Sequence, residues 1–269
     1  MREKYIPVLI LFMLFGFFSC QEVVTVNLSS VTPKVVVEGG LTNRPGPYTI
    51  KLSTTTNYFS PQSVNRLSGA KVAIADNSGQ SDTLRETAPG VYVTSTIRGT
   101  SGKTYFLTVN ASGQKYTASA FMTDTVRIDS LSYAVRPPRP GDNGNPSYSF
   151  TCSFTDPPAP GNHYGFRLYR NGVLKDDIVD NRIVDDKFIN GNAQHARIRD
   201  NDLIAGDSVR IELISFDKSA YDFYNTLRQT LSAGGPFSAP PANPATNLNN
   251  SATGYFGVYS ISSRSVLLH

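Results

Sequence analysis

Apolar and polar residues alternate in short segments from residue 34 to residue 122, and turn residues separate these segments. The alternating segments are Val35–Glu38, Tyr48–Leu52, Val72–Ile74, Ser81–Glu86, Val91–Thr94, Tyr105–Val109 and Lys115–Phe121. A period of two places every second side chain on one face of a sheet, and short strands at this spacing are typical of immunoglobulin or fibronectin sandwiches. Because no helical periodicity interrupts them, we predict an N-terminal β-sandwich over residues 34–122.

The remaining chain, residues 123–269, predicts a second β-rich domain of the same sandwich type. Its expected strands are Val126–Tyr133, Tyr148–Thr155, Tyr164–Arg170, Ser208–Phe216 and Gly254–Ser262. Proline-rich loops separate the first three of them. The fold class that follows is mainly β, with two sandwich domains.

One helix, Lys218–Leu231, is inserted in the second domain. Asp217 is placed to cap its first turn, and a Gly-Gly-Pro sequence stops it at residues 234–236. Its apolar face consists of Ala220, Phe223, Tyr224, Leu227 and Leu231. We expect this face to pack on the sheet, because an apolar stripe at helical spacing requires a partner within the fold.

A proline- and asparagine-rich crossing, Pro236–Asn250, joins the helix to the last strand. Its prolines restrict the backbone, and it carries Asn243, Asn247, Asn249 and Asn250. These amides either bond to the local backbone or meet a ligand, and the sequence leaves both possibilities open.

The N-terminus reads as an export signal. A short basic segment precedes the apolar run Tyr5–Phe18, which is shorter than the ~20 residues of a membrane span. Ser19-Cys20 at its end resembles the lipobox of bacterial lipoproteins, in which the cysteine is lipidated and becomes the new N-terminus. We therefore expect a signal peptide over residues 1–19, lipidation at Cys20 and a tether over residues 20–33. The alternative is an ordinary secretory signal with an incidental cysteine.

The second cysteine, Cys152, lies within the alternating segment Tyr148–Thr155. The pattern directs its side chain to the same face as Phe150 and Phe154. We predict a buried, unreactive thiol, because free cysteine in a core behaves as a small apolar residue.

Charge and composition argue against several classes of function. The chain has 25 basic and 21 acidic residues, a formal charge of +4 that is too small and dispersed for a nucleic-acid partner. With three histidines and two cysteines, we expect no catalytic residue, no metal site and no cofactor. Gly99–Thr104 resembles the end of a phosphate loop, but an expected strand follows it, so we read it as a hairpin turn. We expect His163, His195 and His269 in exposed loops.

Two possible ligand sites stay open. The aspartate-rich segment Asp176–Asp207 offers oxygen ligands for calcium, although interleaved basic residues favour a solvated, turn-forming face. Tyrosines provide the second possibility, a platform on which sugar rings would stack. The candidates are Tyr58, Tyr133, Tyr221 and Tyr259, and the alternative for each is a buried packing role.

Several ordered strings resemble, almost end to end, a lipoprotein family of Bacteroidota known as domain of unknown function 4249. They include Val35–Tyr48, Ser68–Ile74, Pro89–Tyr92, Gly102–Val109, Ile128–Tyr133, Gly206–Leu213, Ala220–Leu227, Pro236–Pro244 and Gly254–Tyr259. The resemblance implies an outer-membrane or surface lipoprotein, often encoded beside TonB-dependent receptors. It supplies no catalytic or ligand-binding residue.

Together these observations predict a non-catalytic protein, anchored to the outer membrane through Cys20, on either its periplasmic or its cell-surface side. The leading hypothesis is an accessory or binding partner of a TonB-dependent receptor in nutrient uptake. The alternative is a glycan-binding or adhesive surface module.

Overall fold

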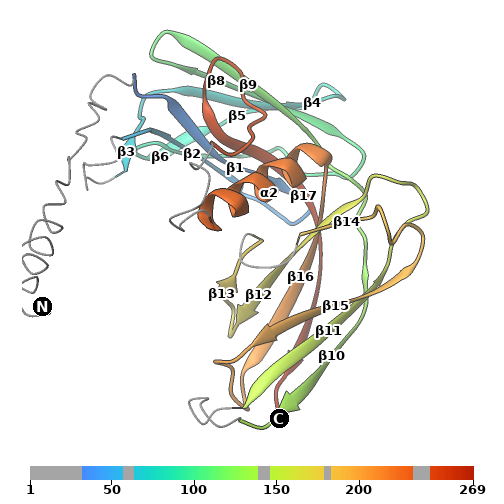
Figure 1. Cartoon of the computed structure of the whole chain (residues 1–269). Helices are drawn as coiled ribbons and strands as arrows, with labels where there is room; N and C mark the ends of the chain where they lie inside the picture. The colour runs from blue at the N-terminus through green and yellow to red at the C-terminus, as the bar shows by residue number, and fades with distance from the viewer. Residues whose placement is uncertain (1–31, 57–63, 139–145, 179–182, 233–242) are drawn as a thin grey trace, which may run out of the picture. The chain divides into compact units, whose positions relative to one another are not determined.

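A computed structural model describes residues 32–56, 64–138, 146–178, 183–232 and 243–269. The chain forms two compact units, one of Met1–Thr32 with Asn57–Phe59 and one of Pro33–Thr56 with Ser60–His269. The first unit lies almost wholly outside the described residues. The predicted fold class is confirmed, because this unit is mainly β with one helix in its described ranges (Figure 1).

Residues from the first half of the chain form a sandwich of two antiparallel layers. One layer belongs to the largest sheet and contains β1 (Val35–Thr42), β2 (Thr49–Thr54), β3 (Asn65–Arg66), β6 (Arg85–Ala88) and β7 (Val91–Val93). The other has the order β5-β4-β8-β9, with β4 (Lys71–Asp76), β5 (Ser81–Thr83), β8 (Thr104–Ala111) and β9 (Gln114–Phe121). The predicted alternation holds, since Ile50, Leu52, Ile74 and Leu107 point into one fully buried core.

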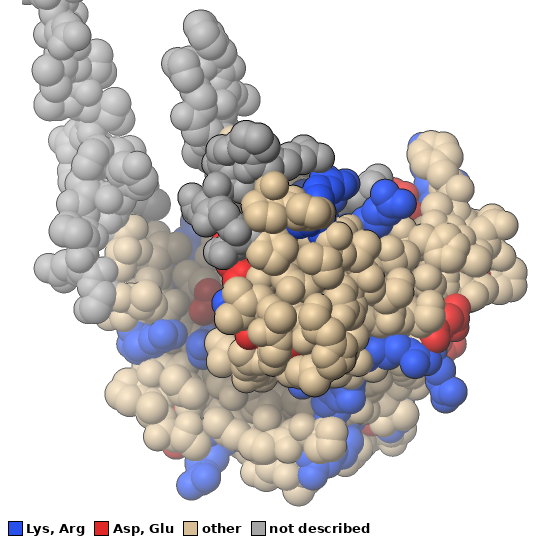
Figure 2. All heavy atoms as spheres, turned by 90° about the horizontal axis from the view of Figure 1, so that it is seen from below, with Lys and Arg blue, Asp and Glu red and all other residues tan. Residues whose placement is uncertain are grey.

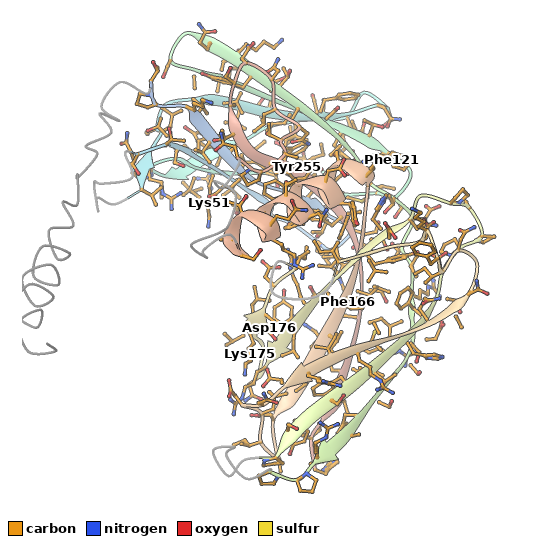
Figure 3. All side chains as sticks on the ribbon, viewed as in Figure 1. Lys51, Phe121, Phe166, Lys175, Asp176 and Tyr255 are labelled. Atoms are coloured by element: carbon orange, nitrogen blue, oxygen red, sulfur yellow. The ribbon has the colours of Figure 1, made fainter. Side chains whose placement is uncertain are left out.

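The second half repeats this layered arrangement. A three-stranded sheet contains β10 (Ile128–Arg136), β11 (Ser147–Thr155) and β15 (Ala193–Asp200). Opposite it, the large sheet continues through β12 (His163–Arg170), β13 (Val173–Asp176), β14 (Val184–Asp185), β16 (Ser208–Phe216) and β17 (Thr253–Leu267). Phe150, Phe154 and Phe166 lie in the core between the two layers, and Phe166 is labelled there in Figure 3.

Strand β17 contributes side chains to both cores. Its first half pairs in parallel with β1, from Thr253 to Tyr259, and its second half pairs antiparallel with β16 up to Leu267. Phe256 therefore packs in the first core although it follows the second domain in sequence. The boundary predicted at residue 123 stays a prediction, but the cores on its two sides share this strand.

Helix α2 (Lys218–Ser232) begins as predicted. Asp217 Oδ1 accepts a hydrogen bond of 2.9 Å from the backbone N–H of Ala220, which satisfies one of the free N–H groups of the first turn. The helix packs on β12 and β17, with Ala220 buried and Phe223 half-buried. The predicted stripe ends early, because Leu231 is 67% exposed.

The described part of the crossing, residues 243–250, closes the open edges of β9 and β17. Asn247 bonds in both directions with the backbone of Phe256 and donates to the carbonyl of Ser119. Asn249 pairs twice with the backbone of Thr117. Side-chain amides thus replace a missing strand, so the first of the two possibilities for these residues is confirmed at Asn247 and Asn249.

Candidate functional site

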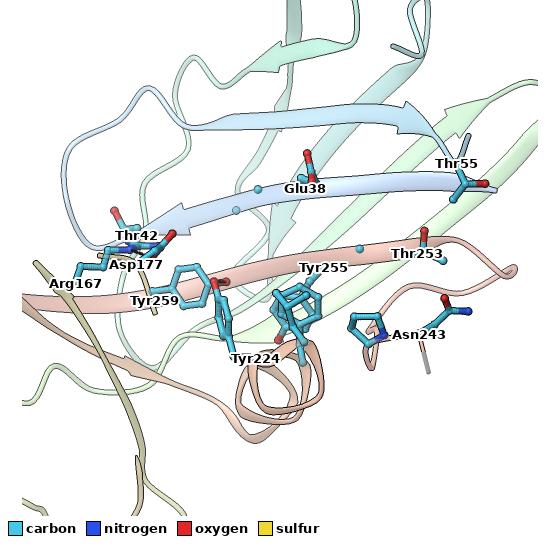
Figure 4. Close-up of a pocket in the computed structure, with 16 residues that line it drawn as sticks. Glu38, Thr42, Thr55, Arg167, Asp177, Tyr224, Asn243, Thr253, Tyr255 and Tyr259 are labelled. Atoms are coloured by element: carbon cyan, nitrogen blue, oxygen red, sulfur yellow. Dashed lines mark hydrogen bonds and ion pairs between the residues drawn. The ribbon is translucent and has the colours of Figure 1, made fainter. Parts of the chain in front are cut away.

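A groove of about 690 Å³ lies between α2 and the outer face of β1 and β17 (Figure 4). We call it the helix groove. Its lining comes from β1, β17, α2 and the start of the last described range, with contributions from β12 and the segment after β13. The lining residues are Glu38, Gly39, Gly40, Thr42, Thr55, Arg167, Asp177, Phe223, Tyr224, Leu227, Asn243, Pro244, Thr253, Gly254, Tyr255 and Tyr259.

Part of the groove floor is bare backbone, because glycines lie there. Gly40 on β1 is paired with Gly257 on β17, and a Cβ atom on Gly40 would lie 1.6 Å from the carbonyl oxygen of Gly257. A Cβ atom on Gly257 would lie 1.9 Å from the hydroxyl of Tyr259, so the ring of Tyr259 occupies that space. Close backbone approach requires both glycines, because a side chain on Gly40 would collide with the backbone of Gly257.

Aromatic rings from β17 and α2 form the wall. Phe223 stacks on Tyr255 with ring centroids 4.8 Å apart and an interplanar angle of 16°. The hydroxyls of Tyr224 and Tyr259 are 3.1 Å apart. Burial raises the pKa of Tyr224, Tyr255 and Tyr259, so the wall stays neutral at physiological pH. Tyr255 lies beside the helix in Figure 3.

Polar groups are arranged around this wall. Burial opposes the charge of Arg167, but the 2.6 Å bond from its Nε to Asp177 and the negative charge of that carboxylate together outweigh burial and raise the pKa of Arg167. In the described part of the chain, the exposed side chains of Glu38 and Asn243 form no hydrogen bond or ion pair. The lining contains the carboxylates of Glu38 and Asp177 and the guanidinium group of Arg167, which together give it a formal charge of −1. The groove therefore offers an acceptor, an amide and aromatic surface to a ligand.

Comparison with known proteins identifies the family. The model of a domain of unknown function, DUF4249, matches residues 21–265. The chain belongs to the DUF4249 family. No curated protein matches it. Among solved structures, the adhesin InvE of Yersinia pseudotuberculosis is 16% identical, with a TM-score of 0.22. That match covers 67% of this chain, which spans about half (55%) of the adhesin.

For this DUF4249 protein, the predicted lipidation site Cys20 and the signal peptide lie outside the described residues. Cys152 is confirmed as a core residue with no exposed surface, and burial raises the pKa of its thiol to about 12. Within the ranges that the structure describes, no helix combines the length and apolar character needed to cross a membrane.

The tyrosines considered for a sugar platform do not form one row. Tyr58 lies outside the described residues. Tyr133 packs against Tyr148, with ring centroids 6.0 Å apart, and Tyr221 packs against His163 with centroids 4.7 Å apart and the rings tilted by 40°. Only Tyr259 belongs to the lining of the helix groove, and it is 9% exposed.

The prediction of exposed histidine loops is wrong for His163. This residue lies on β12, where Tyr221 of α2 covers its ring, and it is 9% exposed. Its ring is a packing surface for the helix, a role that depends on a distant segment. His195 and His269 are exposed, but His195 lies on β15 and its Nδ1 is 2.9 Å from Ser153 Oγ.

The aspartates of Asp176–Asp207 mostly hold loops together. Asp186 accepts bonds from the backbone N–H groups of Gly161 and Asn162, and Asp200 is paired with Lys175 at 2.9 Å. Among the residues with described positions, no three acidic, histidine or cysteine side chains gather as a metal site would require. The segment also contains β14 and β15, so it is not only turns.

On the side of the molecule that Figure 2 shows, the blue side chains of lysine and arginine lie scattered among neutral ones rather than in one dense patch.

Proposed function

We propose that this DUF4249 protein acts by binding, without catalysis, as a lipid-anchored accessory of a TonB-dependent outer-membrane receptor. In this proposal Cys20 carries the anchor, and the helix groove contacts the receptor or its cargo. The lipobox-like N-terminus and the family resemblance motivate the location and the partner. The geometry of the groove is the single observation that motivates binding.

The groove is suited to binding because rigid elements build it. Its floor is a paired sheet, and its aromatic wall is fixed by stacking between Phe223 and Tyr255. A preformed site loses little conformational entropy when a ligand enters. The side chains of Glu38 and Asn243 supply the directional polar contacts that distinguish one ligand from another.

A neutral glycan is the second candidate for the same groove. Sugar rings combine hydroxyls with flat C–H faces, and the groove combines an amide, a carboxylate and threonine hydroxyls with aromatic rings beside bare backbone. The excess of one carboxylate disfavours an anionic sugar here. This candidate corresponds to the glycan-binding alternative.

Affinity purification from detergent-solubilised membranes tests the leading proposal. The bait is the full lipoprotein, and the groove variant is Glu38→Ala combined with Asn243→Ala. Both side chains are exposed, so the double variant should fold normally. The matched control is Lys71→Ala combined with Gln114→Ala, which removes two exposed polar side chains from β4 and β9.

The proposal expects a TonB-dependent receptor to purify with the original chain and the control, and to be reduced at least fivefold with the groove variant. Equal recovery with all three chains would place the contact outside the groove. Recovery of no receptor under several mild detergents, together with groove-dependent binding on an array of neutral glycans, would favour the second candidate.

A further inference from the structure

The outer face of the sheet β10-β11-β15 carries hydroxyls and arginines in register. Its cross-strand rows follow from the pairing of the strands. They are Ser130–Ser153–His195, Ser132–Thr151–Arg197, Ala134–Ser149–Arg199 and Arg136–Ser147. The core-facing residues of the same strands are mostly apolar, among them Tyr148, Phe150 and Ile198. We call the outer side the arginine–hydroxyl face.

The cations of this face repel one another. Arg197 and Arg199 alternate along β15, so their Cα atoms are about 6.8 Å apart on the same side of the sheet. Arg136 adds a third guanidinium two strands away. Within the described ranges none of the three forms an ion pair, whereas Arg167, Arg170, Lys175, Arg210 and Lys218 of the same half of the chain all do.

The rows are also free of acidic side chains. A carboxylate, Asp129, lies only at the end of the face, where it accepts a 3.0 Å bond from Thr155. Like charges on neighbouring positions of a sheet destabilise it, so the sequence retains an unfavourable arrangement that an anion would relieve.

Hydroxyls fill the space between the arginines. The side chains of Ser132, Ser149 and Thr151 are accessible, and in the described structure they have no hydrogen-bond partner. They can donate to and accept from a ligand along two rows of the sheet. Guanidinium groups bind carboxylate or sulfate through paired hydrogen bonds. The face therefore matches a ligand that has both acidic groups and hydroxyls.

Other anionic partners fit less well. A membrane surface would be met by large apolar side chains or by Trp, Tyr or Phe, and the rows of this face contain no apolar residue larger than Ala134. Single-stranded nucleic acid stacks its bases on aromatic rings, and those of β11 point into the core. The rows of hydroxyls and guanidinium groups favour a polymer that lies across the strands.

We propose that the arginine–hydroxyl face binds an acidic polysaccharide, with Arg197 and Arg199 holding its carboxylate or sulfate groups and Ser149 and Thr151 contacting its hydroxyls. This site is separate from the helix groove and does not depend on the receptor partnership. A surface of this kind would hold the protein against acidic polymers outside the cell membrane.

Binding of the full-length lipoprotein in detergent to immobilised heparin and polygalacturonate tests this proposal, with dextran as the neutral polymer. The test variant is Arg197→Gln combined with Arg199→Gln. The control is Arg66→Gln combined with Arg85→Gln, which removes the same charge from exposed positions of β3 and β6. Circular dichroism and urea unfolding confirm that each variant is folded.

We expect the original chain and the control to bind at least one acidic polymer with similar affinity, and not dextran. The test variant should bind at least tenfold more weakly, because it loses the charged hydrogen bonds of two guanidinium groups. If the control variant loses binding to the acidic polymer to the same extent, the effect depends on net charge alone and the proposal is wrong. Absence of binding at 50 mM salt, or stronger binding to vesicles with anionic lipid than to either polymer, would also overturn it.

Discussion

The asparagine crossing gives the sharpest test of how this fold is held together, through the substitution Asn247→Ala. Asn247 donates to the carbonyl of Phe256 at 2.8 Å and accepts from its N–H at 3.1 Å. The same amide donates to the carbonyl of Ser119 on β9 at 3.0 Å. Alanine therefore removes the three hydrogen bonds by which the side chain of Asn247 joins the edges of β9 and β17.

The magnitude follows from the groups that lose a partner. Phe256 has no exposed surface, so water reaches its backbone poorly after the substitution. Each buried backbone group left without a partner costs about 1–3 kcal/mol. Because Asn247 itself is only half-buried, water can replace part of the bond to Ser119. We expect the free energy of unfolding to fall by about 2–4 kcal/mol.

Urea unfolding followed by circular dichroism measures this change, with an unchanged slope m as evidence that the unfolded state is comparable. Asn243→Ala is the matched control, because Asn243 is exposed and lines the helix groove. It should change the free energy of unfolding by less than about 0.5 kcal/mol. The reasoning is refuted if the two variants are equally stable.

Four further outcomes are expected. Cys20→Ala should release the protein from the membrane fraction, and mass spectrometry of the mature N-terminus should find lipid on Cys20 in the original chain. In the Cys20→Ala chain, a thiol reagent should label Cys152 only after unfolding, because the core excludes the reagent; Cys152→Asp should prevent folding. Phe223→Ala should lower the free energy of unfolding by about 2 kcal/mol, less than for a fully buried aromatic residue, because Phe223 is half-buried. The hydroxyl of Ser68, with two backbone N–H groups, lowers the pKa of Glu86 to about 2 from 4.5. The ionised Glu86 side chain therefore makes its full contribution to the free energy of unfolding above pH 4.5 and loses it as the pH falls towards 2. Glu86→Gln should make the free energy of unfolding less dependent on pH in this range, which acid unfolding measures.

Local patterning predicted the strands whose two faces differ strongly in polarity. On β11, Tyr148, Phe150 and Phe154 alternate with hydroxyl residues, and the structure confirms the strand. The neighbouring strand β15 was not predicted. Its inward positions include Gln194 and Ala196, so apolar residues alternate only weakly with polar ones along it. Pairing with β11 imposes the strand, and a single sequence does not show that pairing.

The helix groove was not predicted, although one signal for it exists. Gly39 and Gly40 lie within the strand β1, and Gly254 and Gly257 lie within β17. Glycine within a strand marks close approach of another backbone or a ligand. The missing information was the parallel pairing of β1 with β17, which joins segments more than two hundred residues apart and places these glycines on one floor.

The chain from α2 to β17 explains why stability and binding can be separated in this protein. Its middle part, around Asn247, seals two sheet edges, and β17 joins both cores. Substitutions there should lower stability first and binding only as a consequence. Glu38 and Asn243 face the groove from outside this framework, with exposed side chains. If the groove is a binding site, changing these two residues should remove binding while the unfolding curve stays in place, a combination that a purely structural role for the groove does not produce.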